Sequence, residues 1–286
     1  MIIINTIESL QKQLVIERKA GKTVGFVPTM GALHEGHLSL IRKAGRQNGL
    51  VVCSIFVNPT QFNDKSDFDK YPVQNRKDAQ MLEKAGCDLL FLPSVKEMYP
   101  KGFTQADPID FGFLTATLEG EFRPGHFAGM AQIVEKLLLA VQPNRLYMGQ
   151  KDYQQAMICA DLISRRKMKV ELVVCPIKRE TDGLAMSSRN RRLSRKARSQ
   201  APEIYKTLKW VKREFRKLPV NHFATQVEAL EIAATDKLQA DKVFQVEYLA
   251  IRDVNTLKPL RKPGQNAVAV VACWLGGVRL IDNLEM

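Results

Sequence analysis

Two of the chain's four histidines, His34 and His37, lie three positions apart in the stretch "FVPTMGALHEGHLSLI". They follow a strand-like run that ends near Pro28, and Gly31 and Gly36 accompany them. A helix that starts after such a strand offers backbone N–H groups and the positive end of its dipole, and both favour a bound anion. Because residues three apart on a first helical turn share one face, both imidazoles can reach the same ligand. The spacing therefore predicts a phosphate-binding turn.

A metal site and a pair of ordinary core histidines are the alternatives. The H-E-x-x-H spacing of zinc proteases is absent, because "HEGH" is one residue shorter, and a third ligand such as His126 lies far along the chain. Core histidines would not need the neighbouring glycines, which let a ligand approach the backbone closely. Phosphate binding is the preferred interpretation, and the two alternatives stay open at this point.

Two further stretches could supply cationic groups. The sequence contains neither G-x-x-x-x-G-K-[ST] nor G-x-G-x-x-G, so neither nucleotide fingerprint is present. "MGQKDYQQ" (148–155) places Lys151 where a short strand gives way to a helix. "DGLAMSSRN" (182–190) places Ser187, Ser188 and Arg189 in a loop of small residues. Each stretch alone is typical of solvated surface, and their occurrence together with the histidine turn favours a nucleotide site.

The elements that position these residues alternate between strands and helices. Strands are predicted at 2–5, 23–29, 50–58, 87–93, 145–149 and 169–176, with helices at 5–19, 36–49, 75–86, 131–142 and 152–166. We expect the first helix to be capped by Asn5, with Glu8 at capping-box spacing. Strands that are apolar on both faces and alternate with helices predict a parallel sheet covered on both sides. In such sheets, ligands bind beyond the carboxyl ends of the strands.

The pattern changes after about Ile177. Long helices are predicted at 194–217 and 222–240, followed by strands at 243–253, 266–276 and 278–283 that are joined by Gly and Asn turns. The fold class is therefore α/β, with a Rossmann-like doubly wound parallel sheet over 1–177 and a smaller α+β domain over 178–286. Because the "MSSRN" loop lies between the two domains, we expect the first domain to bind the substrates and the second to act as a lid.

The formal net charge of +13 is concentrated in 165–169, 189–198 and 209–217. Such a balance is typical of proteins that bind a nucleic acid or an anionic substrate such as a nucleotide. Because Trp210, Val211 and Phe215 are interleaved with the basic residues, an amphipathic helix with a solvated basic face is the simpler interpretation.

The five cysteines are odd in number, scattered and never spaced as C-x-x-C. This pattern indicates reduced, buried thiols in a cytoplasmic protein and argues against a disulfide framework or a zinc site. The longest apolar run, 267–278, is shorter than the roughly 20 residues that cross a bilayer. The first residues lack the basic region of a signal peptide.

Five motifs, in chain order, resemble the pantoate–β-alanine ligase (pantothenate synthetase) family: "PTMGALHEGH", "FVNPTQF", "LEGEFRPGHFAGM", "GQKDYQQ" and "DGLAMSSRN". The resemblance covers nearly all of the first 190 residues. "HEGH" is similar to the HIGH signature of the wider nucleotidyltransferase and class I aminoacyl-tRNA synthetase superfamily, and "MSSRN" is similar to its KMSKS loop. One H-x-G-H motif would indicate the superfamily alone, whereas the five together are specific to the ligases.

The resemblance implies a two-step ligation. Pantoate's carboxylate attacks the α-phosphate of ATP, pyrophosphate leaves, and the amine of β-alanine then attacks the pantoyl adenylate to give pantothenate and AMP. Neither step needs a protein nucleophile, and the sequence has no G-x-S-x-G motif. Mg²⁺ is expected with ATP, and Asp152 is its one candidate protein ligand. A cytoplasmic homodimer is expected, and neither a membrane nor a nucleic acid is expected as a partner.

The resemblance also implies the residues of the site. ATP contacts are expected from Met30, Gly31, Ala32, Leu33, His34, Glu35, Gly36, His37, Gly149, Gln150, Lys151, Asp152, Lys178, Met186, Ser187, Ser188 and Arg189. Catalysis is expected from His34, His37, Lys151, Ser187, Ser188 and Arg189, with His37 as a proton donor. Pantoate and β-alanine contacts are expected from Pro28, Thr29, Met30, Asn58, Gln61 and Gln155.

Three positions carry less definite expectations. Glu119 and Arg123 match the third motif without an assigned role. Lys178 stands where an apolar residue is expected near adenine, so its side chain is harmless only if the backbone makes that contact.

Two other functions remain under consideration. One is a nucleotidyltransferase that acts on a phosphorylated acceptor through the same histidine turn; its acceptor site would need more Lys or Arg in place of Gln61 and Gln155. The other is a nucleic-acid-binding protein built on an inactive synthetase-like core, which the net charge motivates. The sequence has no RNP1-like run, which argues against the nucleic-acid-binding protein. Because the five motifs together are specific to the ligases, the ligase is the preferred interpretation.

Overall fold

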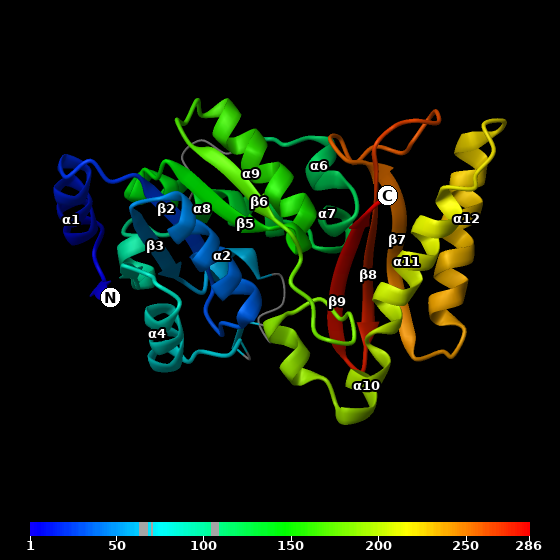
Figure 1. The fold of residues 1–286 in the computed structure, drawn as a ribbon, viewed down its shortest axis with the longest axis horizontal. Coiled ribbons are helices and arrows are strands. Elements are labelled where there is room, and N and C mark those ends of the chain that lie inside the picture. Colours follow the sequence, from blue (N-terminus) through cyan, green and yellow to red (C-terminus); the bar gives the residue numbers. More distant parts are fainter. Residues whose placement is uncertain (63–67, 70, 104–108) are drawn as a thin grey trace. The chain divides into compact units, whose positions relative to one another are not determined.

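The computed structural model describes residues 1–62, 68–69, 71–103 and 109–286. Figure 1 shows the course of the chain, which divides into two compact units. Unit 1 comprises Met1–Gly149 and Gln155–Pro176, and unit 2 comprises Gln150–Gln154 and Ile177–Met286. The sequence pattern changes near the second crossing, at Ile177, but nothing in it marks the earlier excursion of Gln150–Gln154 into unit 2.

Unit 1 is built on a six-stranded sheet with the order β1-β4-β3-β2-β5-β6. Its strands are β1 (Ile2–Ile4), β2 (Val24–Thr29), β3 (Leu50–Ile55), β4 (Leu89–Phe91), β5 (Arg145–Gly149) and β6 (Glu171–Cys175). All five pairings are parallel, as the sequence predicts. From β2 the chain adds β3 and β4 on one side, and it later adds β5 and β6 on the other. The carboxyl ends of β2 and β5 therefore flank the topological switch point, where sheets of this kind bind ligands.

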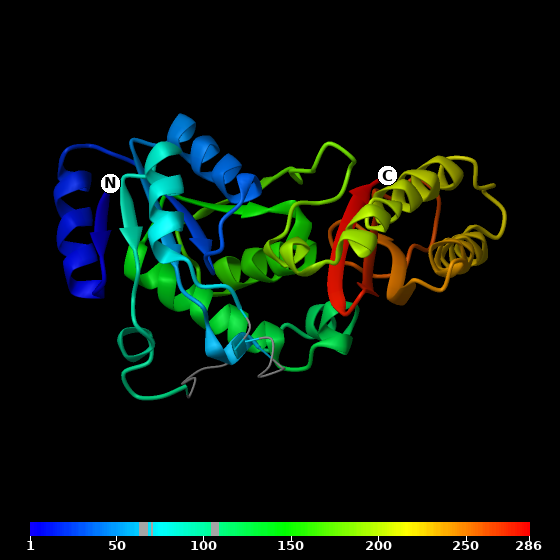
Figure 2. The same cartoon turned by 90° about the horizontal axis from the view of Figure 1, so that it is seen from below.

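Helices cover both faces of this sheet (Figures 1 and 2). Among the described residues, the helices of unit 1 are α1 (Ile7–Lys19), α2 (Glu35–Gln47), α4 (Asn75–Lys84), α5 (Val95–Met98), α6 (Phe113–Ala116), α7 (Glu119–Phe122), α8 (His126–Val141) and α9 (Tyr153–Arg165), with a 3₁₀ turn, η1 (Pro59–Gln61). One apolar cluster joins α1, α8 and α9 to the sheet, and another joins α2 and α4 to it. Unit 1 therefore has three layers, with α2 and α4 on the face opposite α8 and α9.

Two helix starts differ from the prediction. The N-cap of α1 is Thr6, whose hydroxyl accepts from the Ser9 N–H, and not Asn5. Helix α8 begins five residues before the predicted start at 131, because Gly125 adopts a left-handed conformation (φ +78°) that turns the chain into the helix. The early start brings His126 to the first turn of a buried helix.

Unit 2 packs three helices against a three-stranded antiparallel sheet. Its elements are η2 (Gln150–Asp152), η3 (Ser188–Arg192), α10 (Arg195–Gln200), α11 (Glu203–Phe215), α12 (Phe223–Gln239), β7 (Phe244–Asp253), β8 (Ala267–Leu275) and β9 (Val278–Glu285), with the sheet order β7-β8-β9. The single helix predicted at 194–217 is wrong. It is interrupted between Gln200 and Glu203, because Pro202 has no N–H to continue the α10 ladder.

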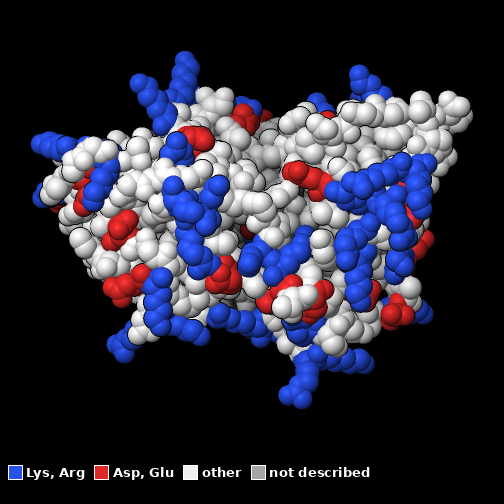
Figure 3. All heavy atoms as spheres, viewed as in Figure 1, with Lys and Arg blue, Asp and Glu red and all other residues white. Residues whose placement is uncertain are grey.

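The basic residues of unit 2 are concentrated in one segment. Residues 189–217 contain twelve Lys or Arg and two Glu, and Figure 3 shows basic side chains gathered over α11. The opposite side of α11 buries Ile204, Leu208 and Val211. Helix α11 is therefore amphipathic, in agreement with the simpler interpretation of the charge.

All five cysteines are buried and unpaired, which confirms the predicted free thiols. Burial raises the pKa of Cys87, Cys159 and Cys273 to about 12, so these thiols stay protonated and weakly nucleophilic near neutral pH. Among the described residues, no helix is both long and apolar enough to cross a membrane.

Candidate functional site

The two histidines cap helix α2. His34 is the N-cap residue, and its Nδ1 accepts from the Gly36 N–H at 3.1 Å. His37 Nδ1 in turn accepts from the His34 N–H at 3.4 Å. The ring centroids lie 4.1 Å apart. The two side chains thus form a reciprocal capping box, in which the second residue is a histidine in place of the usual Glu or Gln.

This arrangement determines which nitrogen of each ring carries the proton. A ring nitrogen that accepts an N–H is unprotonated, so in the neutral imidazole the other nitrogen, Nε2, is the donor. The N–H groups of Gly36, His37 and Leu38 are engaged with His34. Part of the predicted backbone N–H cradle is therefore already used within the turn.

The loop before the histidines is held by a buried carboxylate that the sequence reasoning missed. Asp78 of α4 is fully buried, and its two oxygens accept from the N–H groups of Ala32 (2.8 Å) and Leu33 (2.9 Å). Gly31 (φ +80°) and Ala32 (φ +51°) are both left-handed, a conformation that costs energy for alanine. Asp78 stabilises this turn. Its signal in the sequence is an acidic residue one helical turn before the core residue Leu82.

Ala32 and Leu33 stay predicted ATP contacts. Both side chains are fully buried, so such a contact would be made by their backbone or through the shape of the loop. Met30 and Glu35, at the two ends of the same stretch, keep partly exposed side chains.

Gln61 lies in η1 beside the predicted pantoate residues. Its side chain is 8% exposed; Nε2 donates to Met30 Sδ at 2.9 Å, and Oε1 accepts from Asn58 Nδ2 at 3.2 Å. Asn58 Oδ1 accepts from the Tyr99 hydroxyl at 2.7 Å. The structure therefore brings Met30, Asn58 and Gln61 together, and it adds Tyr99, which the motifs did not suggest.

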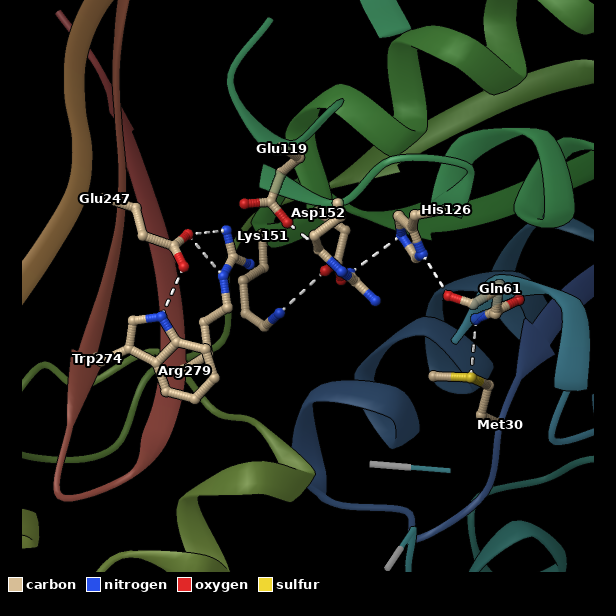
Figure 4. A network of polar contacts seen from close by, with 10 residues as sticks. Met30, Gln61, Glu119, His126, Lys151, Asp152, Glu247, Trp274 and Arg279 are labelled. Carbon is tan, nitrogen blue, oxygen red and sulfur yellow. Dashed lines mark hydrogen bonds and ion pairs between the residues drawn. The ribbon is translucent and has the colours of Figure 1, made fainter. Parts of the chain in front are cut away.

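His126 holds the same turn from the other side (Figure 4). Its Nδ1 lies 2.7 Å from the Gln61 carbonyl oxygen, and its Nε2 lies 3.1 Å from an Arg123 guanidinium nitrogen. A carbonyl only accepts and a guanidinium only donates, so His126 is neutral with its proton on Nδ1. Arg123 also lies 3.8 Å from the carboxylate of the 8%-exposed Glu119. Glu119 and Arg123 thereby acquire a structural role, because they support His126 and through it Gln61.

The other predicted residues of unit 1 are less closely linked. Gln155, in the first turn of α9, is partly buried, and no hydrogen bond joins it to Gln61 in the described part of the chain. Thr29 donates from Oγ1 to the Ser54 carbonyl at 2.8 Å. No group of three or more His, Cys, Asp or Glu side chains within the described ranges is arranged to hold a metal ion.

Unit 2 carries Lys151 on η2. Lys151 Nζ lies 3.0 Å from Asp152 Oδ1, and its side chain is 18% exposed against 47% for Asp152. The carbonyl groups of Gln150 and Lys151 both accept from Asn283 Nδ2, at 2.8 and 3.0 Å. The turn that presents Lys151 is therefore bound to strand β9.

The MSSRN segment follows a short hairpin in the same unit. The Lys178 carbonyl accepts from the Met186 N–H at 3.0 Å, and the Leu184 carbonyl accepts from the Glu180 N–H at 2.8 Å. Ser187 starts η3, and its Oγ accepts from the Arg189 N–H at 3.3 Å. The Lys178 side chain is exposed while its backbone is paired, so the charge that departs from the family pattern is solvated.

Arg179 and Asp282 were not predicted as functional residues. They form a bidentate pair, with Nη1–Oδ2 at 2.6 Å and Nη2–Oδ1 at 2.9 Å. Burial raises the pKa of Asp282, and the Arg179 guanidinium opposes this shift. In the sequence, "LIDN" is typical of the end of a strand, and nothing in its composition identifies Asp282 and Asn283 as part of a site.

Known proteins match this chain along almost its whole length. A family model described as Pantoate-beta-alanine ligase matches residues 2–285. Relatives named pantothenate synthetase from Cytophaga hutchinsonii and Thermotoga neapolitana are each 44% identical, over 286 and 283 residues, and in each case 99% of both chains is covered.

Solved structures give the same result. The pantothenate synthetase of Thermus thermophilus superposes with a TM-score of 0.89 at 43% identity, covering 100% of this chain and 99% of that one. A pantoate-β-alanine ligase from Francisella tularensis, complexed with beta-gamma ATP and β-alanine, superposes with a TM-score of 0.78 at 36% identity, covering 100% and 97%. From its motifs, its fold and these matches, the chain belongs to the pantoate-β-alanine ligase (pantothenate synthetase) family.

Proposed function

We propose that this chain condenses pantoate with β-alanine to give pantothenate, AMP and pyrophosphate, and that it does so through pantoyl adenylate. The ATP-dependent condensation is the activity of the family to which the chain belongs. The observation that carries the adenylate step is the reciprocal His34–His37 capping box beyond the carboxyl end of β2, at the switch point of the sheet.

In the first step, the pantoate carboxylate attacks the α-phosphorus of ATP and the bond to the pyrophosphate oxygen breaks. Negative charge grows on the leaving group, so fixed donors and cations are the main source of catalysis. The Nε2–H groups of His34 and His37, at the positive end of the α2 dipole, donate to phosphate oxygens. These groups stabilise the developing charge through hydrogen bonds, and His37 is the predicted proton donor.

Unit 2 supplies the cationic groups. Lys151 and Arg189 balance the charge of the phosphates, and the hydroxyls of Ser187 and Ser188 donate to them. The remaining predicted contacts with ATP are made by Met30, Glu35, Gly36, Gly149, Gln150, Asp152 and Met186, and by the backbone of Gly31, Ala32, Leu33 and Lys178. Closure of unit 2 as a lid would shield the adenylate, a reactive mixed anhydride, from water.

Pantoate is held by uncharged groups. The Gln61 amide, which Asn58 holds while His126 holds the Gln61 backbone carbonyl, binds the hydroxyl and carboxylate oxygens of pantoate together with Gln155. Pro28, Thr29 and Met30 line the same site. An amide donates to the carboxylate without a fixed positive charge, so the nucleophile keeps its reactivity. In the second step, the β-alanine amine attacks the acyl carbon, and AMP leaves with its electron pair.

Mg²⁺ is the proposed partner of ATP. This ion usually keeps several waters and binds through substrate phosphates with one or two carboxylates. Asp152, half exposed beside Lys151, is a donor of this kind. The residues therefore fit an ion that arrives with ATP and is held mainly by its phosphates. A cytoplasmic homodimer is likewise proposed from the family resemblance, and sedimentation or light scattering would test the assembly.

Pyrophosphate release tests the function directly. ATP, Mg²⁺ and pantoate alone should give one equivalent of pyrophosphate per active site, and addition of β-alanine should make the release catalytic. An acceptor-phosphate transferase would give no pantoate-dependent release. A nucleic-acid-binding protein would show neither phase, and its affinity for RNA would fall steeply with salt.

A further inference from the structure

We propose that Asp282 and Asn283, adjacent residues of β9, are positioning residues for ATP activation that hold the Lys151 turn and the hairpin before Ser187 on one strand. This inference rests on the proposed function, because it takes Lys151 and Ser187–Arg189 as the groups that contact ATP. Neither Asp282 nor Asn283 belongs to any of the five motifs.

Asn283 holds the Lys151 turn. It is 2% exposed, and both hydrogens of its Nδ2 are used, on the carbonyls of Gln150 (2.8 Å) and Lys151 (3.0 Å). Its buried Oδ1 has no hydrogen-bond partner among the described residues. An unpaired buried acceptor costs about 1–3 kcal/mol. The buried Oδ1 therefore costs stability, while the Nδ2 group of the same side chain donates to two consecutive carbonyls. Neither Asp nor an apolar residue could make these two donations.

Asp282 holds the hairpin. Its carboxylate is 4% exposed and pairs with both terminal nitrogens of Arg179. Arg179 also donates to the Gly183 carbonyl at 3.1 Å, across the hairpin, and its guanidinium lies 3.7 Å from the centre of the Tyr205 ring. A Cβ on Gly183 would lie 2.6 Å from that ring, so the hairpin and α11 are in close contact.

The two attachments are coupled through the strand. Side chains of consecutive strand residues point to opposite faces, so one dipeptide can reach two separate segments. The Asn283 N–H also donates to Asp282 Oδ1 at 2.8 Å, and Arg179 donates to the Asn283 carbonyl at 3.2 Å. Since both segments are bound to the same two residues, Lys151 and the start of the MSSRN segment keep a fixed mutual geometry within unit 2.

Three variants separate positioning from general stability. Asn283→Asp keeps the shape of the side chain but removes both donors, and Asn283→Ala removes the group. Glu231→Gln is the matched control: Glu231 accepts from the Ile251 N–H and pairs with Arg252, and both side chains of the pair are under 20% exposed. This pair joins α12 to β7 and touches neither the Lys151 turn nor the hairpin, so it reports the effect of weakening a similar buried contact in the same unit.

We expect both Asn283 variants to lower kcat/KM for ATP by about tenfold or more in pantoate-dependent pyrophosphate release, because small displacements of a catalytic group are costly. The KM for pantoate should change less than twofold. Glu231→Gln should leave kcat/KM for ATP and the KM for pantoate within about twofold of their values in the unmodified chain. Equal losses in the Asn283 and Glu231 variants would overturn the inference.

A double-mutant cycle with Lys151→Ala gives the decisive result. If Asn283 acts through the Lys151 turn, Asn283→Ala should cost less than about twofold when Lys151 is already absent. The same tenfold loss in both backgrounds would overturn the inference while leaving the ligase activity intact. Absence of pantoate-dependent release in the unmodified chain would instead overturn the proposed function, and the inference with it.

Discussion

The side chains of His34 and His37 cap the same helix turn reciprocally, each accepting a backbone N–H through its Nδ1 at 3.1 and 3.4 Å. The geometry assigns the proton of both neutral rings to Nε2, whereas the contacts of His126 assign its proton to Nδ1. Long-range ¹H–¹⁵N NMR distinguishes these tautomers. We expect the Nε2–H tautomer for His34 and His37 and the Nδ1–H tautomer for His126. Nδ1–H signals for His34 and His37 would contradict the capping box.

Replacement of His37 should separate capping from catalysis. His37→Ala should lower adenylate formation by on the order of 10²-fold or more, the typical cost of a lost donor to a developing charge. His37→Gln is the control, because Gln at this position completes a capping box but has no imidazole N–H. We expect it to retain the melting temperature and remain slow in single-turnover pyrophosphate release. Near-normal rates in His37→Ala would make the residue structural.

Asp78→Asn should weaken both the fold and the reaction. The amide keeps one acceptor and turns an NH₂ group toward the N–H of either Ala32 or Leu33, which leaves a buried donor unpaired at a cost of about 1–3 kcal/mol. Urea unfolding would measure this loss, and the KM for ATP should rise because the loop before His34 relaxes. Asp161→Asn, in an exposed pair with Arg165, should shift stability by less than about 0.5 kcal/mol. Similar values for the two variants would refute the role of Asp78.

Gly129→Ala should disrupt the turn that carries Gln61. A Cβ at Gly129 would lie 2.2 Å from the Thr60 carbonyl oxygen, so α8 or η1 must move, at a cost of about 1–3 kcal/mol or more. Because this movement displaces Asn58 and Gln61, the KM for pantoate should rise. In Gly45→Ala on α2, the nearest atom lies 3.7 Å away, and the variant should gain about 0.5–1 kcal/mol. A Gly129→Ala protein with unchanged pantoate binding would exclude the close contact.

Tyr153 should make the protein sensitive to alkaline pH. Its hydroxyl donates to the Val254 carbonyl at 3.0 Å, and burial raises the pKa of Tyr153 to about 12 from an ordinary value of 10.0. The folded state therefore keeps a proton that the unfolded state loses, so this stabilisation is complete below pH 10 and is lost as pH rises toward 12. Tyr153→Phe should flatten the fall in unfolding free energy over that range. An unchanged slope, or a phenolate that forms near pH 10 in ultraviolet titration, would contradict this.

The order of elements and the sheet type follow from local sequence. Each strand of unit 1 is a short apolar run between helical segments. Its burial on both faces can therefore be predicted without knowing which distant residues cover it. The errors have local causes as well. The cap of α1 is Thr6 and not Asn5, and both residue types are favoured at N-caps. Pro202 divides a helix that periodicity alone would have continued.

The candidate site was predictable where a motif places its groups within a few residues of each other. His34 with His37, Asn58 with Gln61, and Ser187 with Arg189 all lie within three positions and do contact one another. A resemblance of motifs identifies such groups because their mutual geometry is set by one turn of backbone.

Tertiary structure decided the residues that hold these turns. Asp78 reaches Ala32 across 46 positions, His126 reaches Gln61 across 65, and Asn283 reaches Lys151 across 132. Each is a polar side chain buried by packing, and burial at that distance depends on how helices and strands meet. The sequence by itself determined the family and the sheet, and it predicted the groups of the candidate site. The packed fold decided which buried donors and acceptors hold those groups, because a hydrogen bond between distant segments exists only after the chain has brought them together.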